Sequence, residues 1–500
     1  MIKINDYTCY ISAGEACYVF KIADGVPTHV YFGKRVEPED DIAALGLGGS
    51  TKELCVQAEV GGKTKAVDLK CTAVRVIDGD GKSLAVELCD TATKLKATAY
   101  YTPHPRGGIS RRVVIDCADC EDIKLTRVRQ SLDCGIGMGE TENRNSGLEF
   151  FGDCGGNDGD AYAFLCPNAD GSIAVDSGTV ACDCGGDNLY PFGDRPKCAE
   201  LLCVYSDMGK GGATRVLHDV LRNDGADDLS ERAATLFLPA VKQAEIASAV
   251  QAAGELGFGV VAIDISRHDQ AAVQALCAAC KQNGLAAGLR VGGNAPFAMV
   301  AATVEKNDIA YVMIDSPKDG TVDDWRGVFA MRNMLKKEFS DLRIDFGIGT
   351  EAVAKAFSAC YPLAFVRNVI TPDPPESFKS RFDRASLGTL GYELNPAKLS
   401  DGIKRAVRAQ ILSYQDDARC VLHGDVYCDG GSITVVGKDK SRAYAVCACG
   451  GRVRLLGLDE HNLYHVRELN KTLSGAALVH CGVAVSEGTS VLHILQVADY

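Results

Sequence analysis

Long apolar runs, clustered basic residues and tryptophan are all scarce in this sequence. No window approaches the roughly 20 consecutive apolar residues of a transmembrane helix, so we expect a soluble protein. The opening segment MIKINDYTCY has no basic region followed by an apolar stretch, which predicts no secretory signal and a cytoplasmic location. The net charge is -13, and the 53 lysines and arginines are scattered singly or in pairs. This argues against nucleic acid or a membrane as a partner.

Cysteine, by contrast, is abundant, with 22 residues. A secreted chain would use them as disulfides, whereas a cytosolic chain keeps them as thiols or metal ligands. The C-x-x-C pairs are Cys117/Cys120 and Cys277/Cys280, and the second pair lies on the apolar face of a predicted helix at 268–283. We therefore predict reduced, structural cysteines and no metal or other cofactor, with a zinc site as the alternative.

Hydrophobic periodicity divides the chain into three regions. A length of 500 residues exceeds what one hydrophobic core usually organises. Residues 1–205 contain short segments of alternating apolar residues, such as 16–22 and 83–89, separated by glycine, aspartate and asparagine. This pattern predicts an N-terminal antiparallel β-supersandwich. Residues 416–500 return to the same period, which predicts a smaller C-terminal antiparallel β-sandwich.

Between these regions, residues 206–415 alternate continuous apolar strands with amphipathic helices. The predicted strands are 234–238, 258–264, 286–291, 309–315, 342–348 and 363–366. The predicted helices are 213–223, 241–256, 268–283, 295–307, 323–339, 351–360 and 398–414. This alternation is typical of a parallel sheet covered by helices on its outside. Six strand–helix units without an early break favour a closed (β/α)8-like TIM barrel over an open sheet.

Three stretches resemble the α-galactosidases of glycoside hydrolase family 36, in clan D. In the N-terminal region, segments 18–22 and 29–34 and the run Gly108-Ile-Ser-Arg-Arg-Val-Val-Ile are similar to that family's opening strands and its double-arginine strand. At the end of the barrel, Ala385-Ser-Leu-Gly-Thr-Leu-Gly-Tyr-Glu-Leu-Asn and segment 414–427 are similar to its closing barrel segment. Between them, Ala310-Tyr-Val-Met-Ile-Asp315 resembles the strand that carries the nucleophile. The resemblance implies a shortened and divergent member of the family.

The resemblance also implies a retaining mechanism, which needs two carboxylates about 5 Å apart. Asp315, at the end of a predicted barrel strand, is the nucleophile candidate, with a loop or helix-capping role as the alternative. The family's acid/base position corresponds to the run Phe365-Val366-Arg367-Asn368, where asparagine cannot transfer a proton as a carboxylic acid does. The nearest replacement is Asp373, which lies between prolines. The predicted substrate-binding residues are Asp264, Arg290 and Asn368.

Most of the family's other sugar-binding motifs have no counterpart in this sequence. Pyranose pockets are commonly lined by tryptophan or tyrosine, whereas the single Trp325 falls in a predicted helix, where a packing role is favoured. A competing motif, Gly347-Ile-Gly349-Thr-Glu-Ala352, follows a strand as a dinucleotide fingerprint does. We interpret it as a tight turn, with an anion site at the helix N-terminus as a further alternative.

We therefore expect an α-galactosidase-like retaining glycoside hydrolase homologue that acts on terminal α-galactosides. The missing acid/base leaves its catalytic competence open, and the alternative is an inactive family member that serves as a carbohydrate-binding or scaffold protein. An α-galactoside is the expected partner, and a homo-oligomer is the expected assembly.

Overall fold

The computed structural model forms two compact units, Met1–Asp224 with Thr321–Arg326, and Gly225–Gly320 with Gly327–Tyr500. In the part of the chain that the structure describes, no helix is both long and apolar enough to cross a membrane. The described residues are 1–38, 40–46, 49, 51–78, 82–120, 123–133, 141–144, 148–152, 159–167, 171–176, 178–185, 190–192, 195–198, 200–224, 233–315, 322–347, 363–370, 375–429, 432–447, 451–486 and 491–499.

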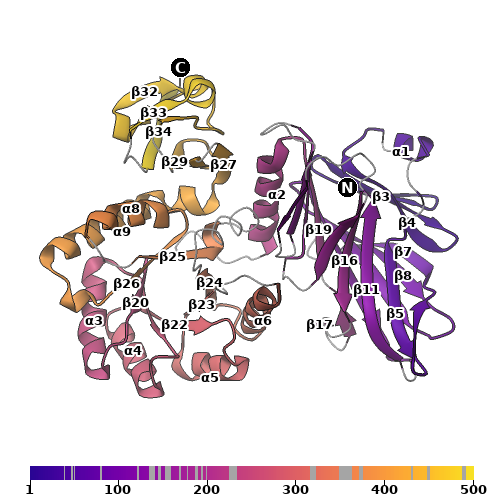
Figure 1. Cartoon of the computed structure of the whole chain (residues 1–500), viewed down its shortest axis with the longest axis horizontal. Helices are drawn as coiled ribbons and strands as arrows, with labels where there is room; N and C mark the ends of the chain where they lie inside the picture. The colour runs from indigo at the N-terminus through magenta and orange to yellow at the C-terminus, as the bar shows by residue number, and fades with distance from the viewer. Residues whose placement is uncertain are drawn as a thin grey trace. The chain divides into compact units, whose positions relative to one another are not determined.

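The first unit consists of antiparallel sheets (Figure 1). One sheet has the order β1 (Ile2–Asn5), β2 (Thr8–Ala13), β3 (Ala16–Ala23) and β4 (Val26–Lys34). A second has the order β15 (Ser172–Asp176), β16 (Thr179–Gly185), β11 (Ile123–Asp133), β5 (Leu54–Val60) and β6 (Lys63–Val67). The largest has the order β12 (Thr141–Arg144), β13 (Leu148–Gly152), β14 (Ala161–Leu165), β19 (Leu201–Ser206), β10 (Gly108–Asp116), β9 (Lys96–Pro103), β8 (Lys82–Cys89) and β7 (Lys70–Asp78), with β17 (Tyr190–Phe192) and β18 (Arg195–Lys197) beside β10. The unit also contains α1 (Asp40–Ala44) and α2 (Gly209–Asp224).

The core of the first unit is mainly apolar, and its buried polar side chains include one hydrogen-bonded group with charged members, which we call the sandwich cluster: Tyr18, His29, Glu53, Tyr101 and Arg111. The Glu53 carboxylate accepts hydrogen bonds from the hydroxyls of Tyr18 and Tyr101 at 2.6 and 2.7 Å, and lies 2.9 Å from His29 Nδ1. Arg111 forms an ion pair with it at 3.0 Å. Burial alone would raise the pKa of Glu53, but Arg111 and His29 outweigh burial and lower it. The cluster is therefore an internally neutralised charge group.

The cysteines of the first unit contribute to the same core. Cys166 and Cys182 are both buried, and their sulfur atoms lie 3.3 Å apart. In the described part of the chain, no two cysteines are joined in a disulfide. In the second unit, Cys277 and Cys280 lie in one helix with Cys280 buried, as the sequence predicts.

The second unit contains a closed parallel barrel, visible as a ring of strands in Figure 1. Its strands, in order, are β20 (Thr235–Leu238), β21 (Val260–Asp264), β22 (Ala286–Gly292), β23 (Tyr311–Asp315), β24 (Arg343–Gly347), β25 (Val366–Ile370) and β26 (Thr389–Glu393). Because β26 pairs with β20 and every neighbouring pair is hydrogen-bonded, the ring closes with seven strands. The expected eight-stranded barrel is thus corrected to seven.

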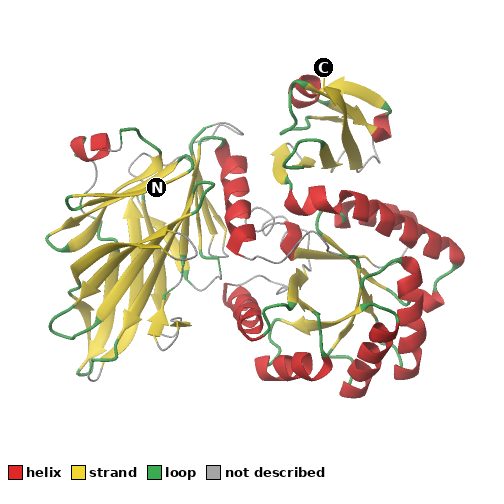
Figure 2. Ribbon diagram, turned by 180° about the vertical axis from the view of Figure 1, so that it is seen from behind, coloured by secondary structure: helices red, strands yellow, loops and turns green. Residues whose placement is uncertain are grey.

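Helices surround this ring, as Figure 2 shows. They are α3 (Gln243–Leu256), α4 (Gln270–Gln282), α5 (Phe297–Asn307), α6 (Val322–Glu338), α8 (Pro375–Ala385) and α9 (Asp401–His423), with short turns η3 (Leu363–Phe365) and η4 (Pro396–Lys398). Helix α3 buries Ile246, Ala249, Val250 and Ala253, residues spaced three and four apart that form one face. Gly257 ends it with φ of 95°, a conformation that glycine adopts without strain.

Two predicted elements differ from the structure. The run predicted as a strand at 363–366 is a 3-10 turn, and the strand begins at Val366 and continues to Ile370. The apolar pattern missed this strand because it contains Arg367, which is buried through an ion pair with Asp345 at 2.6 Å. The last barrel helix extends nine residues beyond 414, to His423. The helix predicted at 351–360 lies outside the described residues.

The C-terminal part of the second unit is an antiparallel sheet with the order β27 (Asp425–Asp429), β28 (Ser432–Val436), β29 (Arg442–Cys447), β34 (Val491–Asp499), β31 (Asn462–Val466) and β32 (Lys471–Ser474). Beside it lie the pair β30 (Gly451–Val453) and β33 (Val483–Val485) and the turns η5 (Arg467–Leu469) and η6 (Ala477–Cys481). Tyr444 donates a hydrogen bond to the carbonyl of Asp383 in α8 at 3.3 Å.

Helix α2 packs on β14 and β19 in the first unit. The three-domain division at 205 and 415 stays a prediction.

Candidate active site at the carboxyl end of the barrel

Four charged residues lie at the carboxyl ends of barrel strands: Asp264 on β21, Arg290 on β22, Asp315 on β23 and Glu393 on β26. The carboxyl ends of parallel strands meet at one edge of a barrel, where barrel enzymes build their active sites. With Arg267 from the loop after β21, these residues form a connected group, which we call the mouth cluster. The structure therefore brings together Asp264, Arg290 and Asp315, three of the residues predicted from sequence.

Arg290 is the centre of the mouth cluster. Its Nε donates to both carboxylate oxygens of Asp315, at 3.0 and 2.9 Å. Its NH1 donates to Glu393 Oε2 at 3.2 Å. One guanidinium thus links carboxylates that are contributed by two strands far apart in the sequence.

Asp264 is held by the loop that follows it. Its Oδ1 accepts hydrogen bonds from the backbone N–H and the hydroxyl of Ser266, at 2.8 and 2.6 Å. Its Oδ2 lies 3.3 Å from Arg267 Nε, and Arg267 NH1 lies 3.6 Å from Glu393 Oε1. The cluster therefore forms a continuous chain of ion pairs from Asp315 through Arg290, Glu393 and Arg267 to Asp264.

The mouth cluster is open to solvent but not fully hydrated. The side chains of Asp315, Arg290 and Glu393 are 33%, 25% and 26% exposed. Burial raises the pKa of Asp315, the hydrogen bonds from Arg290 oppose that rise, and the charges of Asp264 and Glu393 add to it. A carboxyl group whose pKa is shifted at a strand end of a barrel is a functional-site candidate.

Gly347 leaves the space that Asp315 occupies. It lies beside Asp315 at the end of β24, and a Cβ at this position would come within 2.9 Å of Asp315 Oδ1. Any larger residue would displace the carboxylate. The motif that begins at Gly347 continues at 348–352, outside the described residues, so its alternative interpretation as a dinucleotide site stays open.

The remaining predicted site residues do not join the mouth cluster in the described structure. Asn368 donates its amide hydrogen to the carbonyl of Ala385 in α8 at 3.2 Å, which is the helix-covered side of the barrel. Its neighbour Arg367 points inward and stacks over the Tyr311 ring at 5.3 Å. Asp373 lies outside the described residues. The side chain of Trp325, in α6, also lies outside them.

Glu393 was not selected from the sequence. It stands in the run Thr389-Leu-Gly-Tyr-Glu393, which drew attention only as a part of the family resemblance. The signal that could have found it is its position as the polar residue that ends an apolar strand, the same signal that identifies Asp315.

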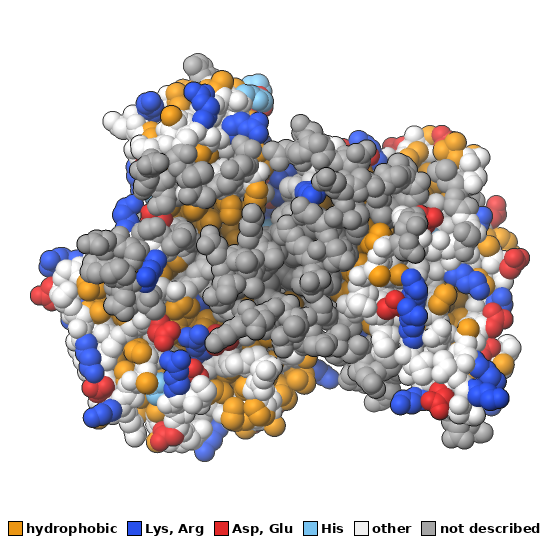
Figure 3. All heavy atoms as spheres, viewed as in Figure 1, with side chains coloured by type: hydrophobic (Ala, Val, Ile, Leu, Met, Phe, Trp, Pro, Cys, Tyr) orange, Lys and Arg blue, Asp and Glu red, His pale blue; other side chains and the backbone are white. Residues whose placement is uncertain are grey.

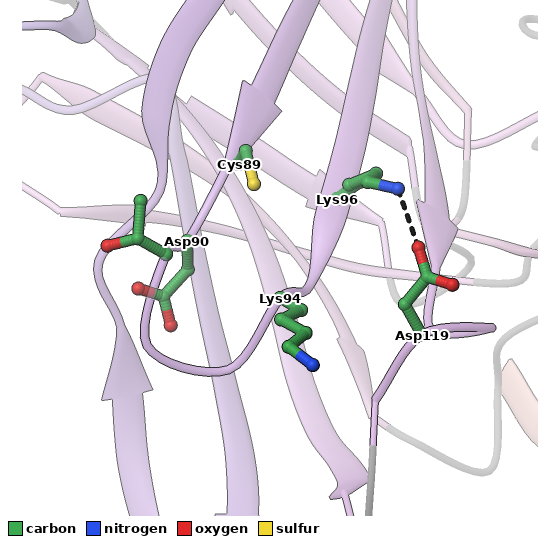
Figure 4. A pocket seen from close by; sticks show the side chains of 6 residues that line it. Cys89, Asp90, Lys94, Lys96 and Asp119 are labelled. Atoms are coloured by element: carbon green, nitrogen blue, oxygen red, sulfur yellow. Dashed lines mark hydrogen bonds and ion pairs between the residues drawn. The ribbon is translucent and has the colours of Figure 1, made fainter.

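Other features of the described surface are weaker candidates for a functional site. A depression on the first unit is lined by Cys89, Asp90, Thr91, Lys94, Lys96 and Asp119 (Figure 4). Its Lys96 and Asp119 already form a 2.7 Å pair, and Asp90 accepts hydrogen bonds within its own turn. On the face in Figure 3, the described basic and acidic side chains are interspersed. Within the described residues, no group of His, Cys, Asp and Glu is arranged to hold a metal ion.

Comparison with known proteins points to one fold. No protein-family model matches the sequence. A relative, the bifunctional alpha-galactosidase/sucrose kinase AgaSK of Mediterraneibacter gnavus, is 31% identical over 137 residues, which cover 24% of this chain and only 15% of that protein. Among solved structures, GH36 alpha-galactosidase AgaA from Geobacillus stearothermophilus has a TM-score of 0.74 at 18% identity, covering 98% of this chain and 100% of that one.

Two further structures agree. The galactosidase domain of AgaSK has a TM-score of 0.76 at 15% identity, covering 99% of this chain and 100% of that one. The alpha-galactosidase from Lactobacillus brevis has a TM-score of 0.73 at 14% identity, covering 100% and 99%. The chain has the fold of the GH36 α-galactosidases. The family resemblance predicted from sequence is thereby confirmed for the fold.

Proposed function

We propose that this chain is an α-galactosidase-type retaining glycoside hydrolase that acts on terminal α-galactosides, with Asp315 as its nucleophile. The observation that carries the proposal is the position of Asp315, a half-buried carboxylate at the carboxyl end of β23, in a chain with the α-galactosidase fold. Variants of AgaA have been solved in complex with raffinose and with stachyose, which suggests α-galactosides as the substrate class. The cytoplasmic location and the homo-oligomeric assembly stay predictions.

The mouth cluster gives each residue a chemical task in this proposal. Asp315 attacks the anomeric carbon, and the bond to the leaving oxygen breaks. The two hydrogen bonds from Arg290 oppose the rise in the pKa of Asp315 that burial causes, and they fix the orientation of the carboxylate. Asp264, held by Ser266 and Arg267, is placed to accept hydrogen bonds from sugar hydroxyls at the same edge.

The test is hydrolysis of an aryl α-galactoside by the purified chain and by Asp315→Asn. An aryl leaving group needs little acid assistance, so this substrate reports on the nucleophile. We expect turnover by the parent chain and its loss in Asp315→Asn. Asp308→Asn is a matched control, because Asp308 is an exposed residue that ends α5 ahead of β23, with φ of 52°, which asparagine tolerates. Equal turnover by Asp315→Asn and by the parent chain would rule out Asp315 as the nucleophile.

A second function, carbohydrate binding without hydrolysis, is favoured by one observation. Both oxygens of Asp315 accept hydrogen bonds from the same Arg290 nitrogen, which reduces the freedom of the carboxylate to attack. Calorimetry with galactose and raffinose separates the two functions. Binding of raffinose by a chain that does not hydrolyse the aryl substrate would support the binding role, and absence of both would leave a scaffold role.

A further inference from the structure

Glu393 is the least constrained carboxylate of the mouth cluster. Both of its contacts are to arginine nitrogens, Arg290 NH1 at 3.2 Å and Arg267 NH1 at 3.6 Å. Asp264 is held more tightly, by the 2.8 and 2.6 Å hydrogen bonds from Ser266. Asp315 receives two hydrogen bonds of about 3 Å. These longer contacts leave Glu393 less firmly fixed in position than its two neighbours.

Glu393 also faces the interior of the barrel mouth. Along β26, Tyr392 points outward and donates to Gln410 of α9 at 2.9 Å. A Cβ on Gly391 would point inward, against Phe237 and Arg367. Because side chains alternate along a strand, Glu393 shares the inward side with Gly391.

The seven-stranded ring places Glu393 across the mouth from Asp315. β24 and β25 separate their strands on one side, and β20, β21 and β22 on the other. Barrel diameter grows with the number of strands, so this mouth is narrower than that of an eight-stranded barrel. The single side chain of Arg290 consequently reaches both carboxylates.

We propose that Glu393 is the proton-transferring residue of the barrel site, opposite Asp315. The inference rests on the proposed hydrolase function. The bound glycoside first displaces Arg290 and Arg267 from Glu393, and the freed carboxylate takes up a proton from water. In the first step, the Asp315 carboxylate forms a bond to the anomeric carbon, the glycosidic bond breaks, and Glu393 donates this proton to the leaving oxygen. In the second step, Glu393 removes a proton from water, the resulting oxygen bonds to the anomeric carbon, and the ester to Asp315 breaks. Glu393 thereby supplies the role that asparagine at 368 cannot fill.

The experiment compares substrates that differ in leaving-group ability. Glu393→Gln is assayed on 2,4-dinitrophenyl α-galactoside, which needs no protonation, and on raffinose, which does. We expect about 10²- to 10⁴-fold lower turnover of raffinose, with far less loss of the first step on the activated substrate. Asp264→Asn is the matched control, since a binding carboxylate of the same cluster lowers both rates to a similar extent. Thermal midpoints equal to that of the parent establish that the variants are folded.

Azide gives a second readout that a structural role would not produce. With Glu393→Ala, azide needs no general base, so it accelerates turnover and yields the α-galactosyl azide. With Asp315→Ala, azide replaces the nucleophile and yields the β-azide. The two anomers therefore assign the two carboxylates independently of rates.

The outcomes separate the inference from the function on which it rests. If the parent hydrolyses both substrates and Glu393→Gln slows them equally, without azide rescue, Glu393 is not the proton donor, although the hydrolase function stands. If the parent hydrolyses neither substrate, the proposed function and this inference are both overturned. The α-azide product from Glu393→Ala supports both.

Discussion

The sandwich cluster and the mouth cluster use the same chemistry in opposite surroundings. In each, one arginine neutralises acidic side chains: Arg111 with Glu53 in the first unit, and Arg290 with Asp315 and Glu393 in the second. Glu53 is 0% exposed and is also bonded by Tyr18, Tyr101 and His29, whereas Asp315 is one-third exposed. Burial makes the first cluster a requirement of folding, because an unpaired charge there cannot be hydrated. The second remains accessible to a ligand.

The largest effect on stability is expected from a substitution of Glu53 in the sandwich cluster. Glu53→Gln leaves Arg111 buried without its counter-charge, and we expect the first unit to lose about 3–5 kcal/mol of unfolding free energy. Urea denaturation followed by circular dichroism measures this. Glu87→Gln is the control, because Glu87 forms an exposed pair with Arg75. A loss no greater than that of the control would show that the sandwich cluster is not essential.

Two matched substitutions inside the barrel test whether a buried charge pair contributes more to folding than an accessible one. Asp345 is buried with Arg367 below the mouth, and Asp315 lies on the neighbouring strand at the mouth. We expect Asp345→Asn to cost about 3–5 kcal/mol and Asp315→Asn about 1 kcal/mol or less. Thermal unfolding of both variants checks the ranking, and the opposite order would contradict it.

His493 provides an intermediate case, since its side chain is 17% exposed. It lies between Asp417 of α9 and Glu468 of η5, with Tyr444 and Arg442 of β29 nearby. Burial alone would lower the pKa of His493, but the hydrogen bonds that its ring donates to Asp417 and Glu468 raise it to about 9.

Because the folded pKa exceeds the ordinary value, the stabilisation is complete below about pH 6.5 and is lost as pH rises through about 9. We expect a loss of about 3 kcal/mol over this range. Thermal midpoints between pH 6 and 10 measure it. His493→Gln removes the dependence, whereas His465→Gln, on the adjacent β31, retains it. An unchanged profile in His493→Gln would refute the assignment.

The smallest effect is expected at the exposed pair of Lys96 and Asp119. Both side chains are more than half exposed, so water screens their interaction. We expect Lys96→Ala to leave the thermal midpoint of the first unit unchanged. A clear drop would mean that exposure does not determine the weight of a charge pair in this protein.

Much of the architecture could be predicted from local pattern. Strands at 234–238, 258–264, 286–291, 309–315 and 342–348 are confirmed to within two residues at each end, because buried parallel strands are continuous apolar runs. The strand after η3 was misplaced because Arg367, a buried charge, interrupts the apolar run, and its partner Asp345 is 22 residues away. A pattern method cannot recognise an ion pair between two strands.

The residues of the candidate site were likewise predicted only in part. Asp264, Arg290 and Asp315 could be selected because each lies at or near the end of a predicted strand, and strand ends share one edge. Asn368 occupies a similar position in the sequence but points to α8, because the inward direction at this strand belongs to Arg367. Glu393 was overlooked because its strand was not predicted.

The sequence by itself determined five of the barrel strands, the helices between them and the polar residues Asp264, Arg290 and Asp315 at the strand ends, because periodicity and residue type act over a few neighbours. Only the tertiary structure decided that seven strands close the ring and that Glu393 and Arg290, 103 residues apart, meet beside Asp315. Closure depends on hydrogen bonds between the first and last strands. Such contacts between distant residues leave no local trace in the chain.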